Sequence, residues 1–258
     1  PVLMLQTIEQ GELKKLAARF WPGPLTIILR KRPGVPDIVS AGLSTVAVRM
    51  PNHPLTLQLI KRCGPLTAPS ANRSGKPSPT KPYHIEEDFG RIFPVLDGGE
   101  YDIGLESTVL DLTRTPFTIA RPGAVSKKVL EECLGDEIKT ETDPAGKGKM
   151  KPSSPGVKYS HYKPEATVCW IERPPGTIRS DTLYLLHSDL QKEFEKGERN
   201  NVICFSGNYQ ILAKRLYDLF RYADHKGYSQ IAIEKLPVTS ESSLIPPLLN
   251  RISKAIKS

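Results

Sequence analysis

Apolar residues recur at two spacings along the chain, and the order of these spacings predicts its secondary structure. In the segment 7–20, apolar side chains fall every three or four residues, which predicts a helix that stops at the turn Pro22-Gly23-Pro24. Apolar runs of strand length come after this turn, at residues 25–30, 45–50, 93–97, 107–112 and 117–121. Residues 1–135 are therefore expected to form an α/β domain with a mixed sheet.

Two further helices are expected among these strands. One follows His53 and begins with Pro54, because proline is tolerated in the first turn of a helix, and it ends at Gly64. The other begins after Ser126 as its N-cap and ends at Gly135. Its buried side chains are expected to be Val129, Leu130, Cys133 and Leu134.

A change of composition divides the chain. From residue 136 onwards it becomes rich in Lys, Glu, Asp, Thr, Ser, Gly and Pro, and we expect a linker over residues 136–166. The end of this linker, SSPGVKYSHYKPEA, gathers two tyrosines and a histidine, which is unusual for a passive linker, so we expect it to make a contact. Residues 167–258 then repeat the α/β pattern and predict a second, smaller domain, with an amphipathic helix near 210–226.

The overall composition narrows the class of protein. Hydrophobic residues make up 38% of the chain and charged residues 25%, which is enough apolar material for packed cores. No run approaches the ~20 apolar residues of a membrane-spanning helix, and no secretory signal is expected. The cysteines are widely spaced, so we expect free, mostly buried thiols in a reducing, cytoplasmic compartment; they are Cys63, Cys133, Cys169 and Cys204.

The formal net charge is +8, from 36 Lys and Arg against 28 Asp and Glu. Such an excess favours an anionic partner, such as nucleotide phosphate or RNA, and is equally compatible with an ordinary solvated surface. The five histidines show no metal-binding spacing, so a protein-ligated metal is not expected.

Small hydroxyl, amide and glycine residues crowd the segment 66–78, directly after a short apolar run. The backbone N–H groups of such a segment, with the side chains of Ser70, Asn72 and Ser78, are suited to hold phosphate oxygens. The charge of Lys76 would assist them. The alternative is an ordinary polar turn, because neither GxxxxGK[ST] nor GxGxxG occurs in the chain.

Arg49 and Arg121 each stand at the end of a predicted strand. A guanidinium there would project into the adjoining cleft, where its fork of donors suits a carboxylate; pairing with a nearby Asp or Glu is the alternative. Ser107 opens another strand, and its hydroxyl is suited either to a small polar substrate or to the backbone of the turn. No His and Asp can be assigned beside a serine, so no catalytic acid, base or nucleophile is assigned.

Six segments, taken in order, resemble the YrdC-like domain of threonylcarbamoyl-AMP synthases; they are FWPGPLTIIL, STVAVRMPNHP, LTAPSANRSGKPSPT, VLDGG, ESTVLDL and IARPGAV. SSPGVKYSHYKPEA and the part that follows it resemble the linker and C-terminal domain of the two-domain form of the family. The resemblance implies an α/β fold: a YrdC-like twisted mixed-sheet domain followed by a smaller Rossmann-like domain.

The resemblance also implies a nucleotidyltransferase that converts L-threonine, bicarbonate and ATP, accompanied by Mg²⁺, into threonylcarbamoyl-AMP and pyrophosphate. The product would supply downstream threonylcarbamoyl-transferase machinery that modifies adenosine in tRNA. By the same resemblance, threonine is held by Arg49, Ala68 and Ser107. The residues expected around ATP are Thr45, Ser70, Asn72, Ser78 and Arg121, with Tyr159 and His161 closing over the site as a lid.

The family's domain normally begins with a proline-threonine-glutamate-threonine motif and a KxR segment that binds ATP phosphates, and neither occurs in this sequence. We therefore expect the chain to be truncated. We also expect that this chain alone can be inactive. Two other hypotheses remain open. One is a non-catalytic RNA- or nucleotide-binding module that keeps the YrdC-like cleft, and the other is a structural partner in a tRNA-modification assembly.

Overall fold

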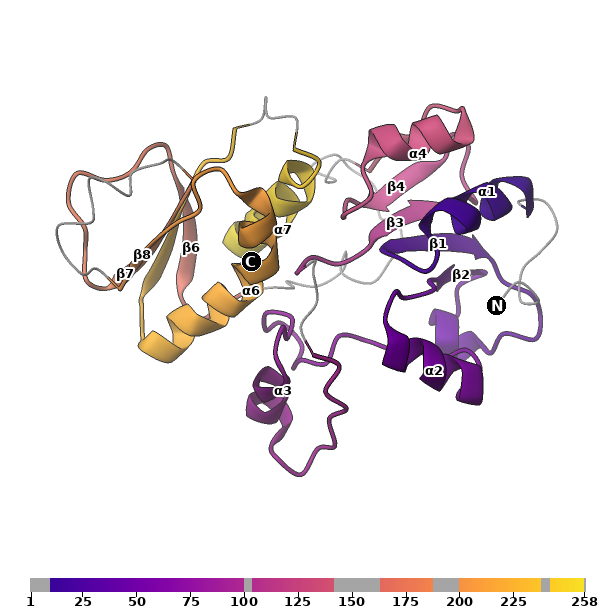
Figure 1. The fold of residues 1–258 in the computed structure, drawn as a ribbon, viewed down its shortest axis with the longest axis horizontal. Coiled ribbons are helices and arrows are strands. Elements are labelled where there is room, and N and C mark those ends of the chain that lie inside the picture. The colour runs from indigo at the N-terminus through magenta and orange to yellow at the C-terminus, as the bar shows by residue number, and fades with distance from the viewer. Residues whose placement is uncertain (1–9, 100–103, 142–162, 188–199, 238–241, 258) are drawn as a thin grey trace. The chain divides into compact units, whose positions relative to one another are not determined.

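The computed structural model describes residues 10–99, 104–141, 163–187, 200–237 and 242–257. The chain divides into two compact units, one made of Pro1–Pro69 and Glu106–Lys158 and the other of Ser70–Leu105 and Tyr159–Ser258. The segment 70–105 is thus grouped with the C-terminal part of the chain (Figure 1). The domain boundaries predicted after residues 135 and 166 stay a prediction.

The first unit contains a five-stranded mixed sheet in the order β2-β1-β3-β4-β5. Its strands are β1 (Leu25–Arg30), β2 (Thr45–Val48), β3 (Thr108–Asp111), β4 (Thr118–Arg121) and β5 (Lys139–Thr140). β1 runs antiparallel to β2 and parallel to β3, and β3 runs antiparallel to β4. The first four strands lie where the apolar runs predicted them, and the mixed α/β class is confirmed.

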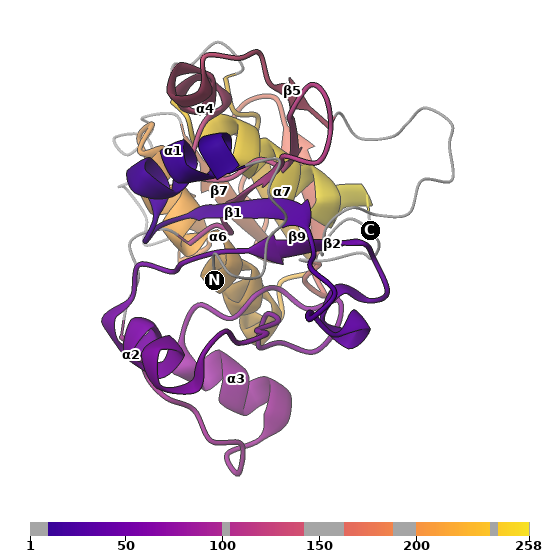
Figure 2. The same ribbon diagram turned by 90° about the vertical axis from the view of Figure 1, so that its right-hand side faces the viewer.

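Helices cover one face of this sheet. Successive side chains of a strand point to opposite faces, so Ile27 and Ile28 of β1 lie on different sides of the sheet. The face of Ile27 packs against α1 (Gln10–Phe20) and α4 (Lys127–Leu134), which lie on the same side of the sheet (Figure 2). Leu16 of α1 and Leu130 of α4 are fully buried there. This face holds the main core of the first unit.

The opposite face is less apolar. Its buried hydrophobic cluster in the described residues consists of Ile28, Val109 and Ala120. The polar side chains of Thr26 and Ser107 share this face, since they stand two residues before Ile28 and Val109. The polar side chains of the sheet that are candidates for function therefore lie on the face that α1 and α4 do not cover.

The helix ends follow the sequence signals. α2 (Pro54–Cys63) begins after His53, whose side chain accepts the Thr56 N–H, and it ends at Gly64. α4 begins after Ser126, whose hydroxyl accepts the Val129 N–H. A 3₁₀ helix at Asp37–Ser40 was not predicted.

The second unit contains a four-stranded sheet in the order β6-β9-β7-β8, in which every pair is parallel. Its strands are β6 (Thr167–Ile171), β7 (Thr182–Leu186), β8 (Val202–Cys204) and β9 (Gln230–Glu234). One face packs against α6 (Tyr209–Lys226) and α7 (Ile245–Lys257), with Phe220 and Leu248 fully buried. The same unit includes α3 (Pro82–Phe89), which the sequence interpretation did not predict.

The strand predicted at residues 93–97 is wrong. These residues form no strand, and the side chains of Phe93 and Leu96 are 50% and 73% exposed. Phe93 instead stacks on Phe89, with 5.2 Å between ring centroids. A short apolar run forms a strand only beside another strand that offers hydrogen-bonding partners, and the described part of 70–105 contains none.

The prediction of mostly buried thiols is also wrong. All four cysteines are free, but Cys63 is exposed and the other three are only half-buried. In the described parts of the chain, no helix has the length and apolar character needed to cross a membrane.

Candidate functional site

The polar face of the first sheet brings Ser107 and Arg121 together. The Ser107 hydroxyl, directly before β3, lies 2.6 Å from the Thr26 hydroxyl of the neighbouring strand β1. Nη2 of Arg121, at the end of β4, donates to the Ser107 carbonyl at 3.1 Å and to its hydroxyl at 3.3 Å. Ser107 is also buried. The contacts from the two neighbouring strands therefore hold its hydroxyl in one position.

Arg49 is held by the turn that follows α1. Its Nε donates to the Gly23 carbonyl at 3.0 Å, and the Gly23 N–H donates to the Met50 carbonyl at 2.8 Å. A Cβ at residue 23 would lie 2.3 Å from the Phe20 carbonyl oxygen, which explains the glycine. The WPGP turn therefore does more than stop a helix, since it also fixes the strand-end arginine.

Arg49 and Arg121 lie close enough for their charges to interact. Burial lowers the pKa of the Arg49 guanidinium, and the positive charge of Arg121 lowers this pKa further. Neither arginine forms an ion pair within the described residues, so the alternative of a structural carboxylate partner finds no support there. Two neighbouring guanidiniums in this state are suited to bind carboxylate or phosphate groups.

Gly123 fixes the backbone next to Ser107. A Cβ at residue 123 would lie 2.3 Å from the Thr108 nitrogen and 2.5 Å from the Ser107 carbonyl carbon. The Thr108 hydroxyl donates to the Val125 carbonyl at 2.8 Å and accepts the Val125 N–H at 3.0 Å. The segment after β4 is thereby fastened against the start of β3.

The two other residues of this unit that were predicted to bind substrate are Thr45 and Ala68. Thr45 is at the opposite end of β2 from Arg49, where it pairs with Arg30 of β1. Ala68 is exposed in the segment after α2. No hydrogen bond joins Thr45 to Arg49 or Arg121 in the described residues, so its predicted role stays a prediction.

Residues 72–78 of the predicted phosphate segment form a tight turn in the second unit. The Lys76 N–H donates to the Arg73 carbonyl at 3.1 Å, and Gly75 inside this turn has a φ of 91°, which favours glycine. Nδ2 of Asn72 donates to the carbonyls of Arg73 and Lys76, at 2.9 and 3.0 Å. Ser70 is exposed and Ser78 half-buried. Binding of phosphate by this segment stays a prediction.

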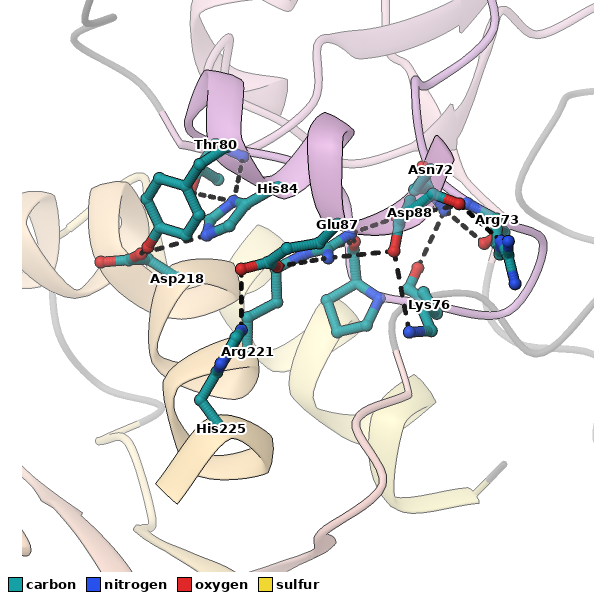
Figure 3. A network of polar contacts seen from close by, with 12 residues as sticks. Asn72, Arg73, Lys76, Thr80, His84, Glu87, Asp88, Asp218, Arg221 and His225 are labelled. Atoms are coloured by element: carbon teal, nitrogen blue, oxygen red, sulfur yellow. Dashed lines mark hydrogen bonds and ion pairs between the residues drawn. The ribbon is translucent and has the colours of Figure 1, made fainter. Parts of the chain in front are cut away.

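Asp88 and Arg221, which the sequence interpretation missed, hold this turn from behind (Figure 3). They come from α3 and α6 and form a buried ion pair, with 2.7 Å between Arg221 Nη2 and Asp88 Oδ2. Arg221 lies between Asp218 and His225 in a polar stripe along α6. This stripe is the only pattern in the sequence that points to Arg221, and it is equally typical of a solvated helix face.

Tyr159 and His161, the predicted lid residues, lie outside the described residues. Within the described ranges, no group of three or more His, Cys, Asp and Glu side chains is arranged to hold a metal ion.

Comparison with known proteins places most of the chain in two family models. Residues 4–123 match the model described as "Telomere recombination", and residues 125–256 match the model described as "Threonylcarbamoyl-AMP synthase, C-terminal domain". A threonylcarbamoyl-AMP synthase of Pyrococcus abyssi is 40% identical over 98% of this chain and 76% of its own length. One of Bacillus subtilis is 38% identical over 94% of this chain and 72% of its own length.

A solved structure agrees with these matches. The crystal structure of P. abyssi Sua5 complexed with L-threonine superposes with a TM-score of 0.82 at 36% sequence identity. The match covers 98% of this chain and 76% of that one. Both the sequence and the fold of the described units therefore point to the same group of proteins.

Proposed function

The chain belongs to the threonylcarbamoyl-AMP synthase family, and from this premise we propose that it is a nucleotidyltransferase that makes threonylcarbamoyl-AMP and pyrophosphate from L-threonine, bicarbonate and ATP. The observation that carries the proposal is the pair Arg49 and Arg121, two cations whose charges interact, of which Arg121 donates to the buried hydroxyl of Ser107. Such a pair suits a reaction that gathers several anions in one small space.

The threonine is proposed to lie along Ser107 and Arg49. The fork of Arg49 would bind the carboxylate of the amino acid, and the Ser107 hydroxyl would bind one of its polar groups. Ala68 would add a backbone contact. Gly23 supports this assignment, because its carbonyl holds Arg49 by Nε, and no hydrogen bond of the terminal guanidinium nitrogens is found within the described residues.

The residues proposed to bind the nucleotide are those that the family resemblance assigns to ATP. Arg121 would contact phosphate oxygens, and the segment with Ser70, Asn72 and Ser78 would surround the rest of the nucleotide. Thr45, Tyr159 and His161 complete the proposed set. The last two would exclude water from the labile carbamate and mixed anhydride.

The proposed reaction has two bond-forming steps. The threonine nitrogen attacks the carbon of bicarbonate, and loss of water gives a carbamate. A carbamate oxygen then attacks the α-phosphorus of ATP, and the bond to the bridging oxygen breaks to release pyrophosphate. Holding the carbamate next to the α-phosphorus would supply much of the acceleration, since no acid, base or nucleophile is assigned.

Mg²⁺ is proposed to enter with ATP, on the phosphate oxygens, where it would offset charge on the departing pyrophosphate. The product is proposed to serve modification of tRNA adenosine by separate threonylcarbamoyl-transferase machinery in the cytoplasm. The same proposal includes direct contact of the chain, whose formal net charge is +8, with RNA.

The test is pyrophosphate release from ATP and bicarbonate, measured with and without L-threonine. We expect pyrophosphate release that depends on L-threonine. Absence of threonine-dependent release would contradict the proposal.

A further inference from the structure

Arg221 of α6 makes four hydrogen bonds to the segment that carries the polar turn. Two of them reach the carboxylate of Asp88, at 2.7 Å from Nη2 and 3.3 Å from Nη1. The other two reach the carbonyl oxygen of Pro77, at 2.7 Å from Nη2 and 3.2 Å from Nε. The guanidinium thus joins helix α3 to the end of the turn (Figure 3).

Asp88 in turn contacts residues of the turn itself. One carboxylate oxygen accepts the Arg73 N–H at 3.3 Å, and the Asp88 carbonyl accepts the Arg73 Nε at 2.6 Å. Nζ of Lys76 lies 3.7 Å from the other carboxylate oxygen. Burial raises the pKa of Asp88, but the hydrogen bond and charge of Arg221 outweigh this and leave the pKa below its ordinary value. The carboxylate is therefore charged at neutral pH.

The side-chain amide of Asn72 lies in the turn that this attachment holds in place. Because Nδ2 faces two carbonyl oxygens, it must be the nitrogen of this amide, and the amide orientation is fixed. Its Oδ1 is buried and has no hydrogen-bond partner in the described part of the chain. The turn thus presents a fixed acceptor that does not take part in its own internal bonding.

A second contact ties the same helices together. His84 of α3 is fully buried, and its Nδ1 accepts the Thr80 N–H at 3.0 Å, so its Nε2 carries the proton and faces Asp218 Oδ1 at 3.5 Å. Nζ of Lys81 donates to the other Asp218 oxygen at 2.9 Å. Helix α6 therefore contacts both ends of α3, through the side chains of Asp218 and Arg221, which stand three residues apart.

We propose that Arg221 is a positioning residue for the nucleotide, through which helix α6 holds the turn of residues 72–78 in the conformation that ATP needs. This inference rests on the proposed function, which assigns ATP to that turn. It gives the C-terminal part of the chain a role in ATP binding that does not require contact with the reacting atoms. A planar fork is needed for it, because a lysine cannot bond a carboxylate and a carbonyl from both edges.

The test compares the full-length protein with its R221K and D88N variants. Losing charge-assisted hydrogen bonds behind the turn is expected to raise the KM for ATP about tenfold in each variant. The KM for threonine should change by less than about twofold, since Arg49 and Ser107 belong to the other compact unit. Because the two residues act through each other, the double variant should raise the KM for ATP by about the same factor as either single variant.

The matched control is R179A. Arg179 also pairs with an aspartate in the second unit, at 2.8 Å from Asp181, but both side chains are largely exposed. This variant should keep the wild-type KM for both substrates. Hydrogen exchange of the Arg73 and Lys76 amides gives a second readout, which should accelerate in R221K and D88N and not in R179A.

Three results would overturn the inference. They are an unchanged KM for ATP in R221K and D88N, equal rises in the KM for ATP and for threonine, and unchanged exchange at the turn. If the wild-type protein shows no threonine-dependent turnover, the proposed function fails, and equilibrium binding of ATP alone decides the inference. Wild-type binding that is about tenfold weaker in R221K supports it, whereas equal binding or no binding contradicts it.

Discussion

Arg121 donates from a single nitrogen to both the carbonyl oxygen and the hydroxyl of Ser107, a residue that stands 14 positions earlier in the chain. In the proposed function these two residues hold different substrates, Ser107 the threonine and Arg121 the nucleotide. Their contact therefore places the two proposed subsites next to each other. A carbamate formed on threonine would lie within reach of the α-phosphorus without a large movement of either substrate.

Replacing Arg49 by alanine is expected to impair threonine use selectively. Loss of the charge-assisted hydrogen bonds to the carboxylate should raise the KM for threonine about 10- to 100-fold, with a smaller change for ATP. Steady-state pyrophosphate release at varied threonine and ATP measures both. R19A is the control, because Arg19 lies on α1 and pairs with Glu132 at 3.9 Å.

Replacing Arg121 by alanine should have the reverse effect. The phosphate contact is lost, so the KM for ATP should rise by about the same factor, and release of the Ser107 hydroxyl should affect threonine less. The same assay applies. If R49A and R121A impair the two substrates equally, the assignment of separate roles is incorrect.

Replacing Gly123 by alanine is expected to destabilise the first unit. The new Cβ would overlap the backbone of Thr108 and Ser107 at 2.3–2.5 Å, and overpacking of this kind costs about 1–3 kcal/mol. Urea unfolding measures the loss, and the KM for threonine should rise with it. G11A serves as the control, because a Cβ at residue 11 meets no atom within 4 Å and alanine favours a helix. Equal stabilities of G123A and wild type would show that the backbone yields without cost.

Asp218 is expected to make stability depend on pH in the acid range. Burial raises its pKa, but the hydrogen bonds of His84 and Lys81 outweigh this and lower the pKa from 3.8 to about 2. A depressed pKa stabilises the folded state above the unfolded pKa, and this stabilisation is lost as the pH falls from about 4 to about 2. The full shift corresponds to about 2 kcal/mol.

The measurement for Asp218 is the free energy of unfolding at about pH 7, pH 4 and pH 2.5, for wild type and D218N. The wild type should lose more stability than D218N across the acid range. D136N, at an exposed position outside the network, should follow the wild type. Parallel acid curves for D218N and wild type would show that this carboxylate is not linked to folding.

The sequence predicted the regular elements well where their neighbours are also regular. β1 and β3 were found as LTIILR and STVLDL because an apolar run bounded by turns forms a strand in a covered sheet. The caps His53 and Ser126 marked α2 and α4 because they act locally. The run at 93–97 misled, since its pattern cannot show whether a partner strand lies beside it.

The candidate site could be predicted only in part. Arg49 and Arg121 were found because each follows a strand, and their placement at the ends of β2 and β4 agrees with that. Arg221 was missed, because its partner Asp88 lies 133 residues earlier in a helix that was not predicted. A buried pair formed across such a separation leaves no local pattern, so a contact of this kind needs the three-dimensional structure.

The ion pair of Asp88 and Arg221 also sets an order of events during synthesis. A ribosome releases α3 well over a hundred residues before α6, and until then the carboxylate of Asp88 has no counterpart from that helix. The polar turn is therefore expected to reach its final conformation on the nascent chain only after α6 has emerged. Cutting the chain near residue 124, between the two family matches, would likewise leave Asp88 in the N-terminal fragment without Arg221, its closest cationic partner in the intact chain.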